Sequence, residues 1–293
     1  MRKIELAVFD LDNTLYDWYA SFLPAFYSMV DTVTSTVECD REVLLDQLRS
    51  IHVKYHDVEH PFSLFETPIV RRLSEAKGDE YVREMLDPAL YSFNKVRKEN
   101  LKLFPDARET LSKLREHHIR LVAFTDSSYF ATLRRIRQLD LVDAFEQIFC
   151  RAKSDSVVKT HQARPSPEDR LASITIELPP DETKPDPRVL IDIAAAERVD
   201  VSSTAYIGDS ISKDVLMAKK AGCFAVWAKY GVRRDPVMYR QLVRISHWTE
   251  QDIQRERNFA AEAEQTVPDF VCEQSIAEIL PILCESNSRT EFR

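Results

Sequence analysis

Between residues 103 and 228 the sequence alternates short apolar runs with helical segments, and this alternation constrains the fold more than any other feature. Residues 119–124, 204–207 and 224–228 are runs rich in branched and aromatic side chains, which are typical of buried strands. Segments with helical periodicity separate these runs. Strands that alternate with helices predict a parallel sheet covered on both faces, so we expect an α/β protein.

A long helical region interrupts this pattern early in the chain. From residue 16 to about residue 98 the β-branched runs disappear and the periodicity is helical. Trp18, Phe22 and Phe26 form an aromatic stripe at helical spacing, which we expect to pack in the interior of this region. His52, His56 and His60 lie four residues apart, a spacing that can bind zinc, but we expect a solvated helix face here.

These patterns predict two domains. The core is expected to comprise residues 1–15 and 99–293, and the all-helical domain residues 16–98. Residues 152–181 and 232–266 do not follow the strand–helix pattern, so we expect them to be peripheral insertions in the core.

Charge and composition exclude several classes of function. The net charge of -8 argues against binding to a nucleic acid, because contacts to the phosphate backbone depend on clustered Lys and Arg. No run approaches the roughly 18 apolar residues of a membrane helix. The five cysteines are scattered without a Cys-x-x-Cys pair, which favours reduced thiols and a cytoplasmic protein. The sequence leaves monomer and homodimer open.

Two aspartates follow the first apolar run. Asp10 and Asp12 come directly after residues 4–9, which are predicted to form a buried strand. Since side chains alternate along a strand, both carboxylates can point the same way where the chain enters a loop. Such a pair can bind a hard cation and divide the roles of nucleophile and acid/base.

Complementary groups follow other predicted strands. Thr125 and the backbone N–H of Asp126, together with the Lys184 ammonium, could hold phosphoryl oxygens. Asp209 and Asp214 supply further oxygen ligands for a small octahedral metal, in practice Mg²⁺. In parallel sheets, ligands bind beyond the carboxyl ends of the strands, where these groups are predicted to lie.

These motifs, in this order, resemble those of the haloacid dehalogenase superfamily. They are Phe9-Asp10-Leu11-Asp12-Asn13-Thr14-Leu15, Thr125-Asp126-Ser127, Lys184-Pro185-Asp186-Pro187, and Gly208-Asp209 with Asp214. The resemblance covers most of residues 1–15 and 100–230. It implies a Rossmann-like, doubly wound core, an inserted helical cap and magnesium-dependent phosphoryl transfer.

The resemblance also implies a role for each residue. Asp10 would be the nucleophile and a metal ligand, and Asp12 the acid/base whose backbone carbonyl also binds the metal. Phosphate would be bound by Thr125, Asp126 and Lys184. Asp209 would bind the metal directly, and Asp214 would assist as an outer ligand. Because the segment before Lys184 is long, Lys153 and Lys159 are alternatives to it, although neither stands in a Lys-Pro-x-Pro context.

The favoured function is hydrolysis of a small-molecule phosphomonoester through an aspartyl-phosphate on Asp10. A phosphomutase on the same scaffold and a catalytically silent binding module are the alternatives. Dehalogenation is disfavoured because a halide leaves without a proton, and the dehalogenases that the chain resembles lack a counterpart of Asp12. The sequence does not identify the substrate among nucleotides, phosphoglycolate and sugar phosphates.

Overall fold

The computed structural model describes residues 3–60, 62–152, 169–232, 235–248, 254, 258 and 265–288. The chain divides into two compact units. We call the first the sheet unit; it comprises Met1–Asp17, Lys102–Arg233 and Arg257–Arg293. We call the second the helical unit; it comprises Trp18–Leu101 and Arg234–Glu256.

The strands of the sheet unit form one seven-stranded parallel sheet in the order β4-β3-β2-β1-β5-β6-β7. They are β1 (Leu6–Phe9), β2 (Arg120–Ser128), β3 (Gln147–Arg151), β4 (Thr175–Leu178), β5 (Thr204–Gly208), β6 (Phe224–Ala228) and β7 (Phe270–Cys272). All residues of the central strands β1 and β5 are buried, as expected where helices cover both faces of a parallel sheet. The predicted α/β class with a Rossmann-like parallel sheet is thus confirmed.

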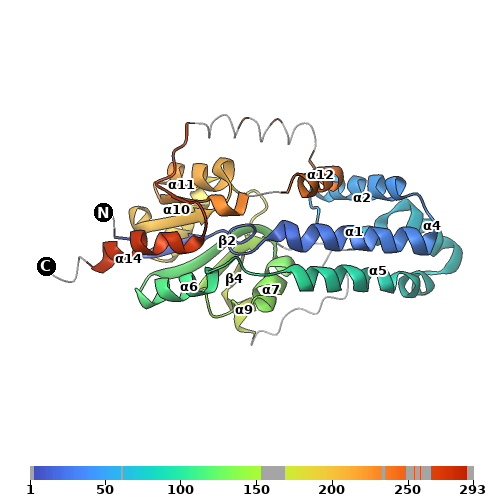
Figure 1. Cartoon of the computed structure of the whole chain (residues 1–293), viewed down its shortest axis with the longest axis horizontal. Coiled ribbons are helices and arrows are strands. Elements are labelled where there is room, and N and C mark those ends of the chain that lie inside the picture. The colour runs from blue at the N-terminus through green and yellow to red at the C-terminus, as the bar shows by residue number, and fades with distance from the viewer. Residues whose placement is uncertain are drawn as a thin grey trace. The chain divides into compact units, whose positions relative to one another are not determined.

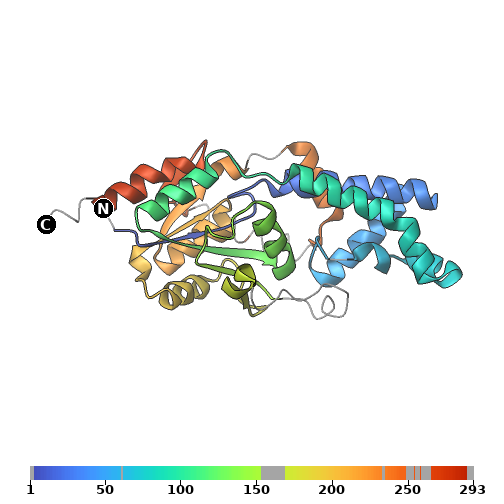
Figure 2. The ribbon, with the colours of Figure 1, turned by 90° about the horizontal axis from the view of Figure 1, so that it is seen from below.

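Helices cover this sheet on both sides. They are α6 (Ala107–Glu116), α7 (Tyr129–Gln138), α9 (Arg170–Ile174), α10 (Pro187–Ala196), α11 (Leu216–Ala221) and α14 (Leu280–Ser288), with the short turns η1 (Val201–Ser203), η2 (Ile211–Val215), η3 (Lys229–Val232) and η4 (Ile276–Ile279). Helix α6 packs beside α14 on one face, and α10 packs beside α11 on the other (Figures 1 and 2). The strand order reverses between β1 and β5, so the carboxyl ends of these two strands mark the topological switch point.

One segment predicted to be a peripheral insertion contributes to the sheet. Within residues 152–181, β4 pairs in parallel with β3 through Ile148 with Thr175 and Arg151 with Leu178. The prediction was wrong for these residues because an edge strand of only four residues, half of it polar, leaves too little periodicity to detect.

The described secondary structure of the helical unit consists of helices alone. They are α1 (Trp18–Val37), α2 (Arg41–Tyr55), α3 (Ser63–Glu66), α4 (Pro68–Lys77), α5 (Asp79–Asn100) and α12 (Pro236–Ile245). The long helices α1 and α5 pack side by side (Figure 1). Phe22 and Phe26 are buried in the core of the unit with Trp18 packed against it, which confirms the predicted role of the aromatic stripe. No helix that the structure describes is long and apolar enough to cross a membrane.

Two features of this unit differ from the sequence-based predictions. Helix α12, predicted to lie in a peripheral insertion of the core, packs on α2 and α1, and its Leu242 and Ile245 join the core of the helical unit. The expected solvated histidine face is also wrong, because His52 and His60 are both buried. His52 Nδ1 lies 2.7 Å from the Ile245 carbonyl oxygen, a partner more than 190 residues away that no local pattern reveals.

Candidate active site

Asp10 lies at the carboxyl end of β1, at the switch point of the sheet. Its backbone N–H donates to the Ile207 carbonyl at 2.8 Å, which continues the pairing of β1 with β5 by one residue. Its side chain is buried, with a relative exposure of 5% for the residue. Lys184 Nζ donates to Asp10 Oδ1 at 2.5 Å, and Thr14 Oγ1 donates to Oδ2 at 3.2 Å. The carboxylate is therefore held from both sides.

The loop that follows Asp10 is fixed by backbone contacts. Asn13 adopts the left-handed conformation, with φ 59°, which asparagine tolerates better than most residues. The Tyr230 hydroxyl donates to the Thr14 carbonyl at 2.6 Å. A Cβ at Gly231 would lie 1.8 Å from the Asn13 carbonyl oxygen, so this close approach requires glycine. The turn η3 thus supports the loop that carries Thr14.

Lys184 supplies the positive charge of the site. Its Nζ lies 2.5 Å from Asp10 Oδ1 and 2.9 Å from Asp214 Oδ1, and the side chain is 5% exposed. It also lies 5.3 Å from the centroid of the Phe124 ring and 5.6 Å from that of Tyr206, within the range of cation–π attraction. Burial alone would lower the pKa of this ammonium, but the carboxylates of Asp10 and Asp214 outweigh burial and raise the pKa. Lys184 is therefore charged at neutral pH.

Asp209 and Asp214 come from the end of β5 and from the turn η2 that follows it. Asp214 Oδ1 accepts a hydrogen bond from the Tyr206 hydroxyl at 3.0 Å, and Oδ2 accepts one from the Ser210 N–H at 2.9 Å. A Cβ at Gly208 would lie 2.4 Å from Asp214 Cγ, so only glycine admits the carboxylate at this place. The π-helical turn η2 directs Asp214 back toward the end of β5.

The carboxylates of Asp10, Asp209 and Asp214 gather into one buried cluster. One oxygen of each lies within 4.8 Å of those of the other two. Burial raises the pKa of the Asp10 carboxyl well above its usual value, against the opposing effect of Lys184, and the charges of Asp214 and Asp209 raise it further. When ionised, three carboxylates beside one ammonium leave an excess of two negative charges. A hard divalent cation with oxygen ligands would compensate this excess.

Asp12 points to different partners from those of Asp10. Its Oδ2 accepts a hydrogen bond from Ser127 Oγ at 2.5 Å, and Arg135 Nη1 lies 3.1 Å from Oδ1 and 3.3 Å from Oδ2. Arg135 also donates to Ser127 Oγ at 2.8 Å. The two aspartates of the motif are therefore separated electrostatically, with a different buried cation beside each.

Of the residues predicted to bind phosphate with Lys184, Asp126 contacts it and Thr125 lies on the adjoining end of β2. Thr125 is buried near the end of β2, and its Oγ1 accepts the Ser127 N–H at 3.1 Å. Asp126 Oδ1 accepts the Lys184 backbone N–H at 3.3 Å, which ties the two predicted positions together. The alternatives to Lys184, Lys153 and Lys159, lie outside the described residues. Of the predicted residues, the structure thus groups Asp10, Lys184, Asp209 and Asp214 most tightly.

Arg135 and Ser127 were not predicted as site residues. Arg135 is 3% exposed, on the face of α7 that also buries Thr132 and Ile136. A charged residue at a buried position of an amphipathic helix is a detectable signal, because such a group is seldom buried unless it is paired. Two further arginines in the same helix, Arg134 and Arg137, made this signal hard to detect.

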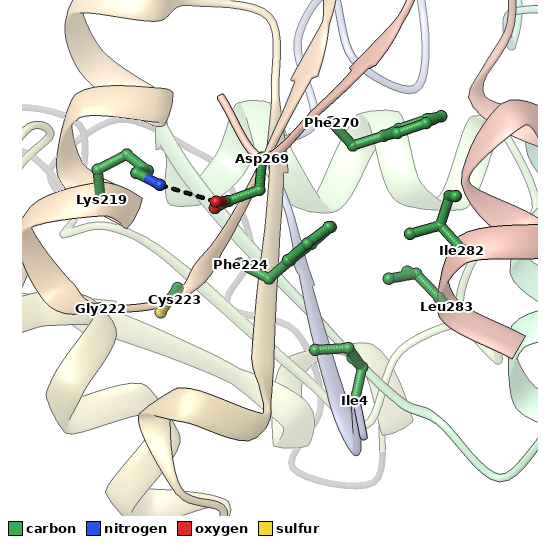
Figure 3. Close-up of a pocket in the computed structure, with 9 residues that line it drawn as sticks. All are labelled: Ile4, Lys219, Gly222, Cys223, Phe224, Asp269, Phe270, Ile282 and Leu283. Atoms are coloured by element: carbon green, nitrogen blue, oxygen red, sulfur yellow. Dashed lines mark hydrogen bonds and ion pairs between the residues drawn. The ribbon is translucent and has the colours of Figure 1, made fainter. Parts of the chain in front are cut away.

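A cavity of about 660 Å³ lies at the other end of the sheet (Figure 3). Phe224 and Phe270, at the amino ends of β6 and β7, point toward Ile282 and Leu283 of α14. The Asp10 cluster lies at the carboxyl ends of the strands. The buried charged groups therefore converge at the opposite end of the strands from this cavity, and such a convergence is a stronger candidate for a site than volume alone.

Comparisons with known proteins agree with the fold and with the motifs. A model of the haloacid dehalogenase-like hydrolase family matches residues 4–222. Glyceraldehyde 3-phosphate phosphatases from Pyrococcus abyssi and Methanopyrus kandleri are each 24% identical to the chain, over 78% and 79% of it and 82% and 87% of their own lengths. The crystal structure of a 2-haloacid dehalogenase from Pseudomonas syringae matches with a TM-score of 0.54 at 19% identity, covering 98% of this chain and 99% of that one. That last likeness shows a shared fold.

Proposed function

Because this chain belongs to the haloacid dehalogenase-like hydrolase family, we propose that it is a magnesium-dependent phosphatase acting on a small phosphomonoester. The observation that carries the proposal is the Asp10 carboxylate, buried between Lys184 and Thr14 and grouped with Asp209 and Asp214. Three relatives bear the name glyceraldehyde 3-phosphate phosphatase. We therefore propose a short phosphorylated carbohydrate of this kind as the first substrate to test.

In the first step, an Asp10 oxygen attacks phosphorus and the bond from phosphorus to the alcohol oxygen breaks. Protonated Asp12 gives its proton to the departing alkoxide, so that a neutral alcohol leaves. The Lys184 ammonium, with the Thr125 hydroxyl and the Asp126 N–H, holds the phosphoryl oxygens and compensates their charge. The product is an acyl phosphate, a mixed anhydride of the Asp10 carboxylate and phosphate.

In the second step, water attacks the phosphorus of this aspartyl-phosphate. Asp12, now a carboxylate, takes a proton from the water, and the bond between Asp10 and phosphorus breaks to release inorganic phosphate. Asp10, Asp209 and Asp214, with the Asp12 backbone carbonyl, would hold Mg²⁺. When bound, Mg²⁺ would allow an anionic nucleophile to approach an anionic phosphate. Its charge matches the excess of the cluster.

The experiment is phosphate release from a panel of phosphomonoesters, with Mg²⁺ or with a chelator, for the wild type and Asp10→Asn. We expect release only with Mg²⁺, and a loss of at least about 10³-fold in the variant, because no other group replaces the nucleophile. Circular dichroism of both proteins would show that the variant is folded. Activity retained in Asp10→Asn would refute the proposed nucleophile.

The same panel separates phosphatase from phosphomutase. A mutase would move the phosphoryl group between hydroxyls, release phosphate slowly and depend on a bisphosphate activator. Phosphate release that matches substrate loss one for one, without activator, is the outcome expected here. No turnover on any ester would favour a binding module instead.

A further inference from the structure

Arg135 is a buried residue of α7 with no part in the two chemical steps above. We propose that Arg135 is a positioning residue which, together with Ser127, fixes the Asp12 carboxylate for proton transfer. This rests on the proposed function, in which Asp12 is the acid and the base. Arg135 acts through Asp12 and need not touch the substrate.

Arg135, Ser127 and Asp12 form a closed triangle of contacts. Arg135 Nη1 reaches both Asp12 oxygens, at 3.1 and 3.3 Å, and also donates to Ser127 Oγ at 2.8 Å. Ser127 Oγ in turn donates to Asp12 Oδ2 at 2.5 Å. Since each oxygen of the carboxylate meets a donor group or a cation, its rotation is restrained. Charge-assisted contacts of this kind are the strongest available for such a purpose.

The Arg135 guanidinium is buried, and burial of a charge costs solvation free energy unless the charge is paired. The Arg135 side chain is 3% exposed, whereas the Asp12 side chain is 22% exposed. A guanidinium removed from water needs a paired charge, and Asp12 provides it. Helix α7 follows β2 directly, so Arg135 is placed by the strand that also carries Thr125 and Ser127. Arg135 is therefore the more deeply buried partner, and the Asp12 side chain keeps some exposure although its Oδ1 atom is buried.

The two aspartates of the motif thus receive separate counter-charges. Lys184 serves Asp10 and Arg135 serves Asp12, and both cations are almost fully buried. A nucleophile must remain a carboxylate, whereas an acid/base must alternate between two states in a fixed place. Arg135 contacts both Asp12 oxygens and so restrains the carboxylate in one place, where it can alternate between these two states.

The test compares Arg135→Met with the wild type on two esters that differ in their leaving groups. Glyceraldehyde 3-phosphate, or the best alkyl phosphate of the panel, needs a proton on its departing alkoxide, whereas p-nitrophenyl phosphate expels a weakly basic phenolate. If Asp12 is misplaced, kcat/KM should fall by about 10- to 100-fold for the alkyl ester and by less than about threefold for the aryl ester. Arg135→Lys should recover part of the loss.

Matched variants exclude a merely structural effect. Arg137→Met removes an exposed arginine from the same helix, which pairs with Asp169, and should leave both rates within about twofold. Ser127→Ala should reproduce the dependence on the leaving group to a smaller extent. Equal losses of Arg135→Met on both esters, or no loss on either, would overturn the proposal.

A second measurement is independent of turnover. In a double-mutant cycle of Arg135→Met and Asp12→Asn, the two effects on the unfolding equilibrium constant should deviate from additivity by at least about tenfold, or about 1.4 kcal/mol. Additive effects would overturn the pairing even in an inactive protein. If the wild type releases no phosphate but the cycle shows coupling, the proposed function fails and the pairing stands.

Discussion

The sheet unit buries charged groups at the carboxyl ends of its strands, whereas the interior of the helical unit is mainly apolar. The side chains of Asp10, Lys184 and Asp214 are each 7% exposed or less, and both carboxylates contact the Lys184 ammonium. The core of the helical unit is built from side chains such as Phe22, Leu48 and Leu86. Buried ion pairs add little net stability compared with apolar side chains of similar volume. The charged cluster therefore signals a function that apolar packing cannot supply.

Removing the ammonium should have a large effect on both stability and activity. In Lys184→Met the carboxylates of Asp10 and Asp214 would lose their nearest positive charge. We expect unfolding to become easier by about 3 kcal/mol at neutral pH without metal, and kcat/KM to fall by about 10²- to 10³-fold. Urea denaturation with and without Mg²⁺ would measure the first effect. A divalent cation should restore part of the lost stability, because it would compensate the same carboxylates.

An equal loss of stability with and without Mg²⁺ would argue that the cation does not bind at these carboxylates. Unchanged stability in Lys184→Met would contradict the expectation that the ammonium stabilises the buried carboxylates of the sheet unit.

In the helical unit, truncation of an apolar side chain should affect stability and leave the chemistry intact. Leu48 is fully buried, so Leu48→Ala should cost about 2–5 kcal/mol through lost burial and the cavity left behind. Val43 is 48% exposed on the same helix, and Val43→Ala should cost less than about 0.5 kcal/mol. Denaturation midpoints would check both. If kcat/KM of Leu48→Ala for p-nitrophenyl phosphate fell at a temperature where the variant is folded, the expectation that this side chain affects stability alone would be wrong.

The sequence located most of the charged cluster because its chemistry follows from the topology of a parallel sheet. Asp10 and Asp209 follow strands that end at the same edge, and each motif could be read within a few residues. Arg135 could not be placed in the same way, since its partner Asp12 is 123 residues away and no pattern links them. Helix α12 was assigned to the wrong unit for a similar reason, because its docking on α2 depends on contacts that cross most of the chain.

His52 is a titratable side chain within this mainly apolar interior, and it makes the helical unit sensitive to acid. Burial lowers its pKa from 6.5 to about 4, against the opposing effect of the Ile245 carbonyl. Because the folded-state pKa lies below the unfolded value, the stabilisation is complete above about pH 6.5 and is lost as the pH falls toward about 4. The loss attributable to His52 is about 3 kcal/mol.

This effect is measured as a difference between variants, since carboxylates throughout the protein also titrate in that range. The unfolding free energy of wild type should fall more steeply from pH 7 to pH 4.5 than that of His52→Gln. The exposed His117→Gln variant serves as the control and should follow the wild type. Parallel curves for wild type and His52→Gln would show that His52 is not held neutral by burial.

A smaller effect on stability than that of His52 is expected at two helix starts with the same sequence, one in each unit. Asp186-Pro187 begins α10 and Asp235-Pro236 begins α12, and each aspartate accepts a backbone N–H of its first turn. Replacing either aspartate by alanine should cost about 1 kcal/mol. Asp186 stands two residues from Lys184, so Asp186→Ala should also lower kcat/KM severalfold, whereas Asp235→Ala should leave it unchanged. Equal losses of kcat/KM in Asp186→Ala and Asp235→Ala would mean that activity follows stability in either unit. That result would contradict the assignment of the chemistry to the sheet unit.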